Sequence, residues 1–550
     1  MTSSRHRDPP PWLPPLSSAL AEALPRLYGA SAADPALLEL IEALTLALER
    51  GEPALALHGP APPGLRAEGW PARHRAALAA SPLGQEPHGP LVVEGPWLGW
   101  RRWLQLRTRV MAALMARAER RRPGVVAAPA AEGLDPQQRQ AIQIALERDL
   151  LVLAGGPGTG KTSTVAHLLA AVSQGVEGAV IQLAAPTGKA AARLRLATGG
   201  RWPCGTLHQL LESRGDGVFR RHRQRPLSLD LLVVDEVSMV DLALMEALLD
   251  ALPERARLVL VGDPAQLPPV APGAPLRDLL SAAHRPALAA SLVTLHTTYR
   301  NEGAIATVAA ALRESIEASP EPPVDPLERM RPLLSRLAAD ANLRWRQELV
   351  GPLPALARER LTDHLRQLRA VSEGCLPGGE QGWRRVLAVR DAFLLLTPRH
   401  RGPWGVHAVH RELLGEVSGN AIDRWPAGTP VLCVRNLHGL GLSNGDLGVV
   451  VGGVERWLLF GQEQPIWVHP AQVSGAVEPA LALTVHKAQG SESRSVMVLL
   501  PGPDPCDPRL LYTALTRARE EAWLFTPPGL EEDAARSGTT AAQRPGKRIG

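Results

Sequence analysis

The chain has 550 residues, enough for three or four domains at roughly 150 residues each, and its 50 glycines and 52 prolines are too few for a low-complexity or collagen-like protein. Its four cysteines form no C-x-x-C pair, which argues against a disulfide framework or a cysteine-built zinc site, and a net charge of +5 permits nucleic acid as a partner without requiring it. No stretch has the character of a signal peptide or a membrane span, so we expect a cytoplasmic protein with no membrane partner.

The first half of the chain predicts a helical region followed by a parallel α/β domain. Residues 1–117 are rich in Ala and Leu at helical spacing, and residues 118–133 have the composition of an exposed linker. Residues 134–302 alternate short apolar runs with helical patterns, which is typical of a parallel sheet with crossover helices. The expected strands are 150–154, 179–184, 231–234, 258–261 and 292–295.

The second half predicts a helical insertion and then another α/β domain. Residues 303–390 are Arg-rich, punctuated by proline and helical in pattern. Residues 391–530 return to the α/β pattern, and short strand-like runs at about 430–473 favour a small β-barrel insert. The polar residues 531–550 predict a disordered tail. The expected fold class is therefore α/β, with two parallel sheets.

A phosphate-binding loop is expected where Gly155 to Thr162 reads Gly-Gly-Pro-Gly-Thr-Gly-Lys-Thr, because this fits G-x-x-x-x-G-K-[ST] between a strand and a helix. Its glycines let backbone amides turn toward phosphate, Lys161 would reach the β- and γ-phosphates of ATP, and Thr162 would ligate Mg²⁺. Lysine is rare here, since only four of the 60 Lys and Arg residues are lysine, so its presence in this loop is informative. The residues expected to bind the nucleotide are Gly155, Gly156, Pro157, Gly158, Thr159, Gly160, Lys161, Thr162 and Ser163.

Two further strand ends carry polar residues suited to the same chemistry. Asp235 and Glu236 follow the apolar run 231–234; Asp235 would hold Mg²⁺ through water, and Glu236 would orient and deprotonate an attacking water. Gln266 lies in the stiff turn after the run 258–261, where it can accept from water and donate to a phosphate oxygen, as a γ-phosphate sensor. Taken alone, the acids could be helix caps and Gln266 a polar turn residue.

Two arginines are further candidates for the catalytic site. Arg300 follows Thr298 and Tyr299, and Arg517 lies in Tyr-Thr-Ala-Leu-Thr-Arg from Tyr512, so that each motif contains one of only three tyrosines. One arginine alone means little in a chain this rich in arginine. A position on the surface of a helix is the alternative explanation for the neighbouring Arg519.

In their order along the chain these segments resemble the superfamily 1 helicases, from residue 134 to about residue 525. Gln138 is similar to the adenine-reading glutamine of that superfamily, and residues 186–194 and 206–208 are similar to its strand-gripping motifs Ia and Ib. The strings Arg401-Gly-Pro-Trp-Gly-Val406 and Gly441-Leu-Ser-Asn-Gly-Asp-Leu-Gly448 resemble the RecD family, the alpha subunits of exodeoxyribonuclease V (RecBCD).

The resemblance implies two RecA-like motor domains, at 134–302 and 391–530, with an SH3-like insert. It implies 5′ to 3′ translocation on single-stranded DNA at duplex ends, assembly with RecB-like and RecC-like subunits, and a part in double-strand break repair by homologous recombination. The N-terminal domain would dock on the RecC-like subunit. The motor domains would close on MgATP, with Arg517 as the arginine finger.

Contacts to the DNA backbone are also expected from the resemblance, and they require no base readout. His486 could equally be a satisfied core histidine. The candidates are Thr187, Lys189, His208, Thr484 and His486.

Three other functions can be weighed against the sequence. A restriction-type nuclease site needs an acid two residues before a lysine, but Thr159, Thr187, Val485 and Pro545 stand there, so cutting would belong to a partner. A free-standing RecD-like helicase begins with tandem helix-hairpin-helix modules, for which the first 130 or so residues leave little room. A non-motor ATP-binding scaffold would not need the complete set of acids, glutamine and arginines.

Overall fold

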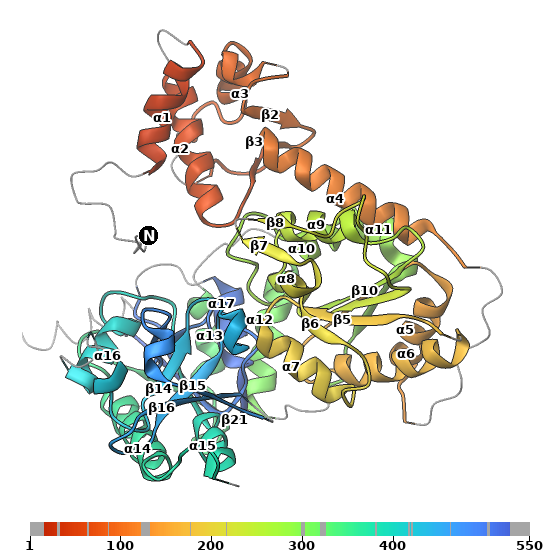
Figure 1. Cartoon of the computed structure of the whole chain (residues 1–550). Coiled ribbons are helices and arrows are strands. Elements are labelled where there is room, and N and C mark those ends of the chain that lie inside the picture. Colours follow the sequence, from red (N-terminus) through yellow and green to blue (C-terminus); the bar gives the residue numbers. More distant parts are fainter. Residues whose placement is uncertain are drawn as a thin grey trace, which may run out of the picture.

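The chain folds into three parts, seen in a computed structural model (Figure 1). They are an N-terminal unit (residues 16–100), a first α/β unit (133–298) and a second α/β unit (303–528), and helix α4 joins the first two. No helix among the described residues is long and apolar enough to cross a membrane. The structure describes residues 16–29, 34–62, 65–85, 87–122, 133–176, 178–215, 217–298, 303–318, 326–379, 382–415, 419, 422–461, 464–502 and 507–528.

The N-terminal unit combines helices with a small antiparallel sheet of order β1-β3-β2. Its own apolar core, which includes Leu37, Leu40, Leu44 and Leu98, is separate from the cores of the α/β units. The sequence predicted helices alone here, because strands of three or four residues are too short to give a periodic signal. The elements are α1 (Leu16–Leu27), α2 (Pro35–Glu49), β1 (Ala54–Ala56), α3 (Ala72–Ala79), β2 (Leu91–Glu94) and β3 (Trp97–Trp100).

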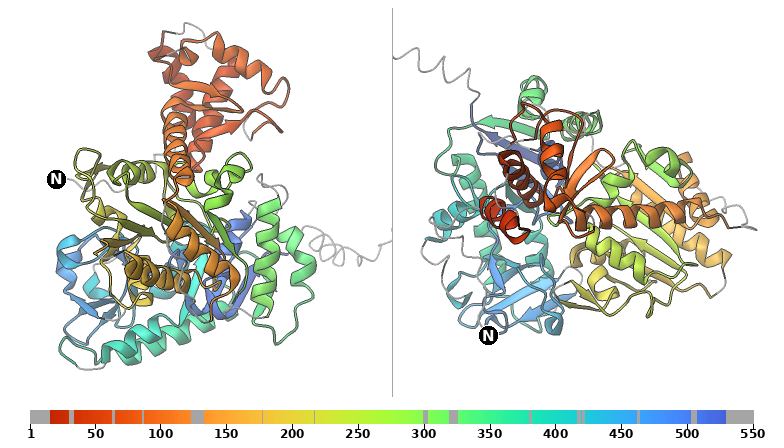
Figure 2. Two further views of the ribbon diagram at one scale, coloured as in Figure 1. Left: turned by 90° about the vertical axis from the view of Figure 1, so that its right-hand side faces the viewer. Right: turned by 90° about the horizontal axis from the view of Figure 1, so that it is seen from above.

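Helix α4 (Arg101–Glu119) begins in the N-terminal unit and ends in the core of the first α/β unit. Its later apolar residues, among them Val110 and Leu114, share a buried cluster with strands of the first sheet. The Arg117 guanidinium donates to the carbonyls of Ala256 at 2.8 Å and Pro253 at 2.9 Å. Figure 2 shows α1 to α3 standing apart from both α/β units, with α4 running down to the first. A domain boundary at residue 117 would therefore cut through this helix.

The first α/β unit is built on a six-stranded sheet of order β11-β4-β10-β9-β5-β6, in which every described pairing is parallel. The five strands expected from the sequence are confirmed, with bounds shifted by at most two residues. The strands are β4 (Leu150–Gly155), β5 (Ile181–Ala185), β6 (Cys204–Thr206), β9 (Leu231–Val234), β10 (Arg257–Gly262) and β11 (Leu292–Leu295), with a hairpin of β7 (Ser213–Gly215) and β8 (Val218–Phe219). The helices are α5 (Pro136–Glu147), α6 (Lys161–Gly175), α7 (Gly188–Ala197), α8 (Leu207–Leu210), α9 (Leu242–Ala251), α10 (Pro275–Leu279) and α11 (Arg285–Leu288).

Both faces of this sheet are covered, which is why its strands are continuously apolar. Successive residues of β4 point to opposite faces: Val152 joins the cluster with α4 and α9, and Leu153 joins the cluster with α5 and α6. In the strand order, β10 lies between β4 and β9. The carboxyl ends of three adjacent strands therefore meet at one edge, and each is followed by a candidate site segment.

The second α/β unit has a five-stranded parallel sheet of order β12-β21-β20-β13-β19. Its edge strand β12 lies in residues 303–390, for which the sequence predicted helices only. Arginines alternate in β12, and they stack on or pair with the neighbouring strand: Arg344 lies 4.8 Å from the Trp523 ring centroid and 2.9 Å from the Glu521 carboxylate. The elements are α12 (Ala304–Ala318), α13 (Pro326–Leu334), β12 (Leu343–Gln347), α14 (Ala355–Ser372), α15 (Gly382–Arg390), β13 (Phe393–Thr397), α16 (Val406–Leu414), β19 (Leu483–Thr484), β20 (Ser493–Leu499), α17 (Pro508–Leu515) and β21 (Ala518–Thr526).

A separate antiparallel sheet interrupts this unit where the sequence predicted a β insert. Its order is β17-β16-β15-β14-β18, and its last strand, β18, lies entirely after residue 473, the expected end of the insert. The linker residues 123–132 and the tail 531–550 lie outside the described residues. The strands are β14 (Pro430–Cys433), β15 (Leu447–Val451), β16 (Trp457–Gly461), β17 (Pro465–Val468) and β18 (Val477–Pro479).

Candidate active site

The phosphate-binding loop lies between β4 and α6. Its backbone is left-handed at Gly158 (φ 73°) and Gly160 (φ 81°), conformations that favour glycine. Lys161 begins α6, and its Nζ donates to the carbonyls of Gly155 at 2.7 Å and Gly156 at 2.8 Å. The ammonium therefore lies against the loop at the amino end of a helix, a position suited to phosphate.

The first two glycines of the loop have no room for a side chain. A Cβ at Gly155 would lie 2.6 Å from Thr159 Oγ1, which itself donates to the Gly156 carbonyl at 2.9 Å. A Cβ at Gly156 would lie 2.7 Å from Arg313 Nη1 and 3.3 Å from Tyr512 Oη. Since Arg313 and Tyr512 belong to α12 and α17, the second α/β unit reaches the phosphate-binding loop directly.

The two predicted acids follow β9 at the same sheet edge. Glu236 has a left-handed backbone (φ 52°), which is unusual outside glycine, and its N–H donates to Asp235 Oδ1 at 2.8 Å. Burial and the Glu236 carboxylate raise the pKa of Asp235 to about 6, and Lys161 and Arg193 oppose that rise. The Asp235 carboxylate therefore interacts electrostatically with Glu236 and with the Lys161 ammonium, and the catalytic and metal-binding roles of these residues stay predictions.

The turn after β10 connects the two α/β units through a fully buried carboxylate. Asp263 Oδ2 accepts from Tyr512 Oη at 2.8 Å, and Asp263 Oδ1 accepts from the Ala265 N–H at 3.1 Å. Gln266 Nε2 lies 3.5 Å from Asp263 Oδ2, while Gln266 Oε1 is buried and has no hydrogen-bond partner among the residues that the structure describes. One oxygen of the predicted sensor residue is thus left to accept from a molecule bound at the site.

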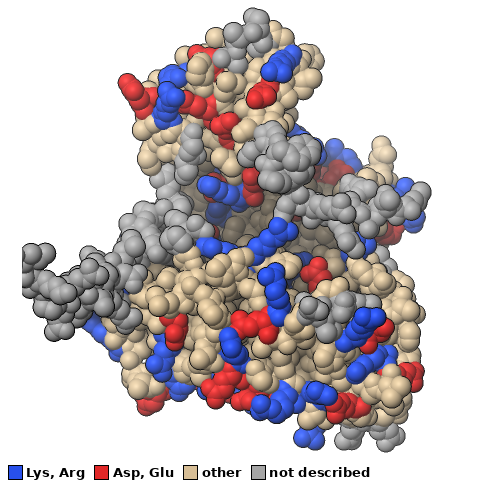
Figure 3. All heavy atoms as spheres, turned by 90° about the vertical axis from the view of Figure 1, so that its left-hand side faces the viewer, with Lys and Arg blue, Asp and Glu red and all other residues tan. Residues whose placement is uncertain are grey.

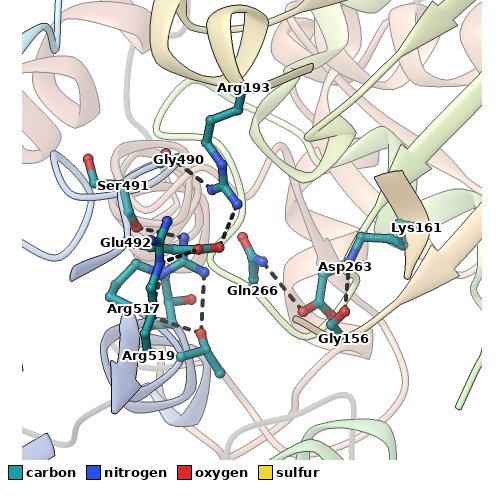
Figure 4. A network of polar contacts seen from close by, with 12 residues as sticks. Gly156, Lys161, Arg193, Asp263, Gln266, Gly490, Ser491, Glu492, Arg517 and Arg519 are labelled. Atoms are coloured by element: carbon teal, nitrogen blue, oxygen red, sulfur yellow. Dashed lines mark hydrogen bonds and ion pairs between the residues drawn. The ribbon is translucent and has the colours of Figure 1, made fainter. Parts of the chain in front are cut away.

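Other bonds tie the first unit to the segment between β19 and β20. Lys189 Nζ donates to Ser491 Oγ at 2.9 Å. Arg193 Nη2 lies 2.6 Å from Glu492 Oε1 (Figure 4). Gln489 Nε2 donates to the Leu267 carbonyl at 3.1 Å. Burial lowers the pKa of Lys189 to about 8, with Arg390 adding to that effect.

The Arg517 guanidinium is bound entirely within the second unit. It is 2% exposed, and its nitrogens donate to the carbonyls of Thr513 at 3.0 Å and Ser491 at 3.3 Å and to Thr516 Oγ1 at 3.3 Å. In Figure 4, Gln266 lies between Arg517 and Lys161. The finger role of Arg517 stays a prediction, and Arg300 lies outside the described residues.

Comparisons with known proteins match both α/β units. A family model described as an AAA domain matches residues 138–272, and one described as a UvrD-like helicase C-terminal domain matches residues 479–525. The RecBCD enzyme subunit RecD of Mycolicibacterium smegmatis is 38% identical over 481 residues, which cover 81% of this chain and 80% of that protein. The chain belongs to the RecD family.

Two other matches agree in sequence with this assignment. The RecD subunit of Mycobacterium tuberculosis H37Rv is 37% identical over 82% of this chain and 80% of its own length. The ATP-dependent RecD2 DNA helicase of Deinococcus radiodurans is 36% identical over 71% of this chain but only 49% of its own length. A crystal structure of Pif1 helicase from Bacteroides with ADP-AlF3 and ssDNA aligns over 76% of this chain and all of that one, at 17% identity and a TM-score of 0.40, too low to carry a conclusion. As a RecD-family member, the chain is an ATP-dependent DNA helicase.

Three predicted DNA-contact residues of this RecD-family chain lie in the first unit, and each has a structural partner. The Thr187 hydroxyl caps α7 by accepting from the Ala190 N–H at 3.3 Å. The His208 ring lies 6.0 Å from the Phe219 ring. Lys189 is bound to Ser491, as described above. Their contacts to DNA stay predictions.

The remaining predicted residues are also placed by local bonds. Thr484 Oγ1 accepts from the Lys487 N–H at 3.3 Å, and burial lowers the pKa of the half-buried His486. Gln138 is 3% exposed, and its Oε1 accepts from the Asp135 N–H at 3.0 Å in a capping box that begins α5. A role in reading adenine stays a prediction.

Sequence reasoning missed Arg313, Asp263 and Tyr512 as a group. Asp263 lies in the turn before Gln266 and Tyr512 opens the motif that contains Arg517, and their pairing could have been suspected from the scarcity of tyrosine. Arg313 lies in an Ala-rich helix without any motif. Only the tertiary fold brings it to the loop.

Proposed function

We propose that the chain is a motor subunit that hydrolyses ATP to move 5′ to 3′ on single-stranded DNA and unwinds duplex ends, together with RecB-like and RecC-like chains. The observation that carries the proposal is that the turn after β10, at the edge of the nucleotide site, is hydrogen-bonded to α17 of the second unit. Tyr512 donates to Asp263, and the Leu267 N–H donates to Thr513 Oγ1 at 3.0 Å. Hydrolysis or release of the terminal phosphate would therefore alter the contacts of both units.

In the proposed reaction, the first unit binds and activates the nucleotide. Lys161 would leave its two loop carbonyls for the β- and γ-phosphates, and Gln138 would face the adenine. Glu236 would orient and deprotonate the attacking water. The same water would donate a hydrogen bond to Gln266 Oε1. These roles need a carboxylate, an amide oxygen and an ammonium at one edge, and they are supported by the three adjacent strands, which all end at that edge.

Mg²⁺ fits the oxygen donors at this edge. The Thr162 hydroxyl on α6 and the Asp235 carboxylate after β9 would hold it, consistent with a cation that keeps several waters and takes few protein ligands. Among the described residues, no cluster of three His, Cys, Asp or Glu side chains competes as a metal site. When bound, Mg²⁺ would neutralise charge that develops on the phosphates.

Closure of the two units is proposed to bring Arg517, and with it Arg300, to the γ-phosphate. To do so Arg517 would exchange its three partners in the second unit for phosphate oxygens. Thr187, Lys189, His208, Thr484 and His486 are proposed to hold the DNA backbone, and domain movement would shift one set against the other. The β14 to β18 sheet is proposed to be the SH3-like insert of two RecA-like motors.

Partner binding is assigned by this proposal to the N-terminal unit. That unit has its own core, touches the rest of the chain mainly through α4, and contains none of the predicted catalytic residues. Basic side chains rim a hollow below it in Figure 3. The RecD subunits of Mycolicibacterium smegmatis and Mycobacterium tuberculosis are 38% and 37% identical over 80% of their length, which supports a role as a subunit. Cutting would belong to a partner, in the cytoplasm.

The test is ATP turnover by the full chain with and without single-stranded DNA, and strand displacement on duplexes with either a 5′ or a 3′ tail. We expect DNA-stimulated turnover and displacement from the 5′ tail only, both lost in Lys161→Ala. Turnover that DNA does not stimulate, or displacement from the 3′ tail only, would refute the proposal. Co-purification of RecB-like and RecC-like chains from native extract tests the partners.

A further inference from the structure

Arg313 approaches the phosphate-binding loop from the opposite α/β unit. Its Nη1 would be 2.7 Å from a Cβ at Gly156, and its Cζ would be 3.8 Å from it. The Gly156 carbonyl is also an acceptor of Lys161 Nζ at 2.8 Å. An arginine and a lysine from different units therefore meet at the same glycine.

The hydrogen bonds of the Arg313 guanidinium are incomplete. Nε donates to Glu317 Oε1 at 3.0 Å. Among the described residues the buried Nη2 has no hydrogen-bond partner, and it forms only a long ion pair with Asp263 Oδ1 at 3.8 Å. The Nη2 atom itself is buried although the side chain as a whole is 17% exposed, so solvent water does not replace the missing acceptor there. A buried charged donor without an acceptor is unfavourable, which implies an acceptor in another state of the site.

We propose that Arg313 donates to the terminal phosphate of a nucleoside triphosphate bound in the loop, as a phosphate-contacting arginine additional to Arg300 and Arg517. The inference rests on the proposed ATP hydrolysis. A P-loop lysine reaches the β- and γ-phosphates, so a guanidinium at the same glycine lies near those oxygens. The planar fork of arginine also matches phosphate better than a point charge does.

The exchange of partners would have a consequence for the contact between the units. Asp263 is shared by Arg313 and Tyr512, which come from two helices of the second unit. When a phosphate takes the Arg313 guanidinium, Asp263 keeps Tyr512 and the Ala265 N–H. Helix α12 is then bonded to the nucleotide instead of to the β10 turn, while α17 stays on that turn.

The experiment compares Arg313→Ala and Arg313→Lys with wild type in the full chain. Arg329→Ala is the matched control, because Arg329 is exposed on α13 and its Nη1 donates to Ser315 Oγ of α12 at 2.8 Å, without contacting the loop. The measurements are the Kd values of a fluorescent non-hydrolysable ATP analogue and of fluorescent ADP, and ATP turnover with saturating single-stranded DNA.

We expect Arg313→Ala to weaken binding of the triphosphate at least tenfold and to lower turnover at least tenfold, with ADP affinity within twofold of wild type. Arg313→Lys should fall between, and Arg329→Ala should match wild type within twofold. Triphosphate affinity and turnover within twofold of wild type in Arg313→Ala would overturn the inference. Equal weakening of both nucleotides would also overturn it, because the arginine would then support the loop without contacting the terminal phosphate.

Thermal unfolding of each variant separates folding from contact. If Arg313→Ala unfolds at a lower temperature than Arg329→Ala, the decision passes to Arg313→Lys, which keeps the charge and the aliphatic stem. If Arg313→Lys is as stable as wild type and binds the triphosphate as tightly, the inference that the Arg313 guanidinium contacts the terminal phosphate is overturned. Absence of ATP turnover in the wild-type chain is a different result, because it refutes the proposed function itself.

Discussion

Replacement of Arg517 by alanine should damage both catalysis and stability, and the structure separates the two. The guanidinium is 2% exposed and has three partners, so its removal leaves two carbonyls and a hydroxyl without a buried donor. At about 1 kcal/mol for each, the free energy of unfolding should fall by about 3 kcal/mol.

The effect on turnover follows from the same bonds. An arginine finger contributes about 10³–10⁵ in rate, or about 4–7 kcal/mol. If Arg517 must first leave three hydrogen bonds, about 3 kcal/mol of that stabilisation is offset. The mid-range leaves about 2.5 kcal/mol, so Arg517→Ala should lower turnover by about 10²-fold. Nucleotide affinity, set largely by the loop of the first unit, should change by no more than about tenfold.

The assay is ATP turnover with saturating single-stranded DNA, with fluorescent nucleotide binding and thermal unfolding of the same samples. Arg517→Lys keeps the charge but not the fork, and it should show the catalytic loss with a smaller loss of stability. Arg519 is an unsuitable control, because its Nε donates to Glu492 Oε2 at 3.1 Å, the carboxylate that also binds Arg193. The exposed Arg494 on β20 serves instead. Equal turnover in Arg517→Ala and wild type, or a larger defect in Arg494→Ala, would refute the reasoning.

Four further outcomes can be measured. Lys161→Arg, like Lys161→Ala, should abolish DNA-stimulated ATP hydrolysis because a guanidinium is too broad for the loop; turnover at the wild-type rate would contradict this. Affinity for single-stranded DNA should fall as salt rises and show no base preference, since phosphates are the expected contacts; sequence-selective binding at fixed salt would count against them. Deletion of residues 1–100, which keeps α4 in the motor core, should release the chain from its complex while ATP turnover survives; continued co-purification would place the interface elsewhere. Burial lowers the pKa of His364 and of His410 to about 4, against about 6.5 in the unfolded chain. The free energy of unfolding should therefore be highest above pH 6.5 and fall between pH 6.5 and 4, by up to about 3 kcal/mol per histidine. An equally steep fall of the unfolding midpoint in His364→Leu would rule out that cause.

The candidate site residues of the first unit could be predicted because each lies in a short sequence motif next to an apolar strand. A phosphate-binding loop, two acids and a glutamine each follow an apolar strand, and parallel strands bring such ends to one edge. The order that places β10 between β4 and β9 was not needed to expect Lys161, Asp235 and Gln266 at one site. Strand ends alone identify the residues.

The contributions of the second unit could not be predicted, because they depend on packing between distant segments. Nothing near Arg313 in sequence distinguishes it from the many arginines on helix surfaces, and only the fold places it beside Gly156. The pattern of α4 shows an apolar stripe without showing which unit that stripe covers. The strand β12 was missed because its arginines do not give an apolar strand pattern. Arg344 is accommodated by stacking on Trp523, more than 170 positions away in sequence.

The position of β21 has a consequence for how the protein is made. This strand is the last element of the described chain, yet it lies inside its sheet, between β12 and β20. During synthesis, the first sheet is complete once residue 295 has left the ribosome, whereas the second waits for residues 518–526 while β12 and β20 expose unpaired edges. Premature termination just before residue 518 should therefore yield a finished first unit attached to an open sheet, a species that aggregates or is held by chaperones.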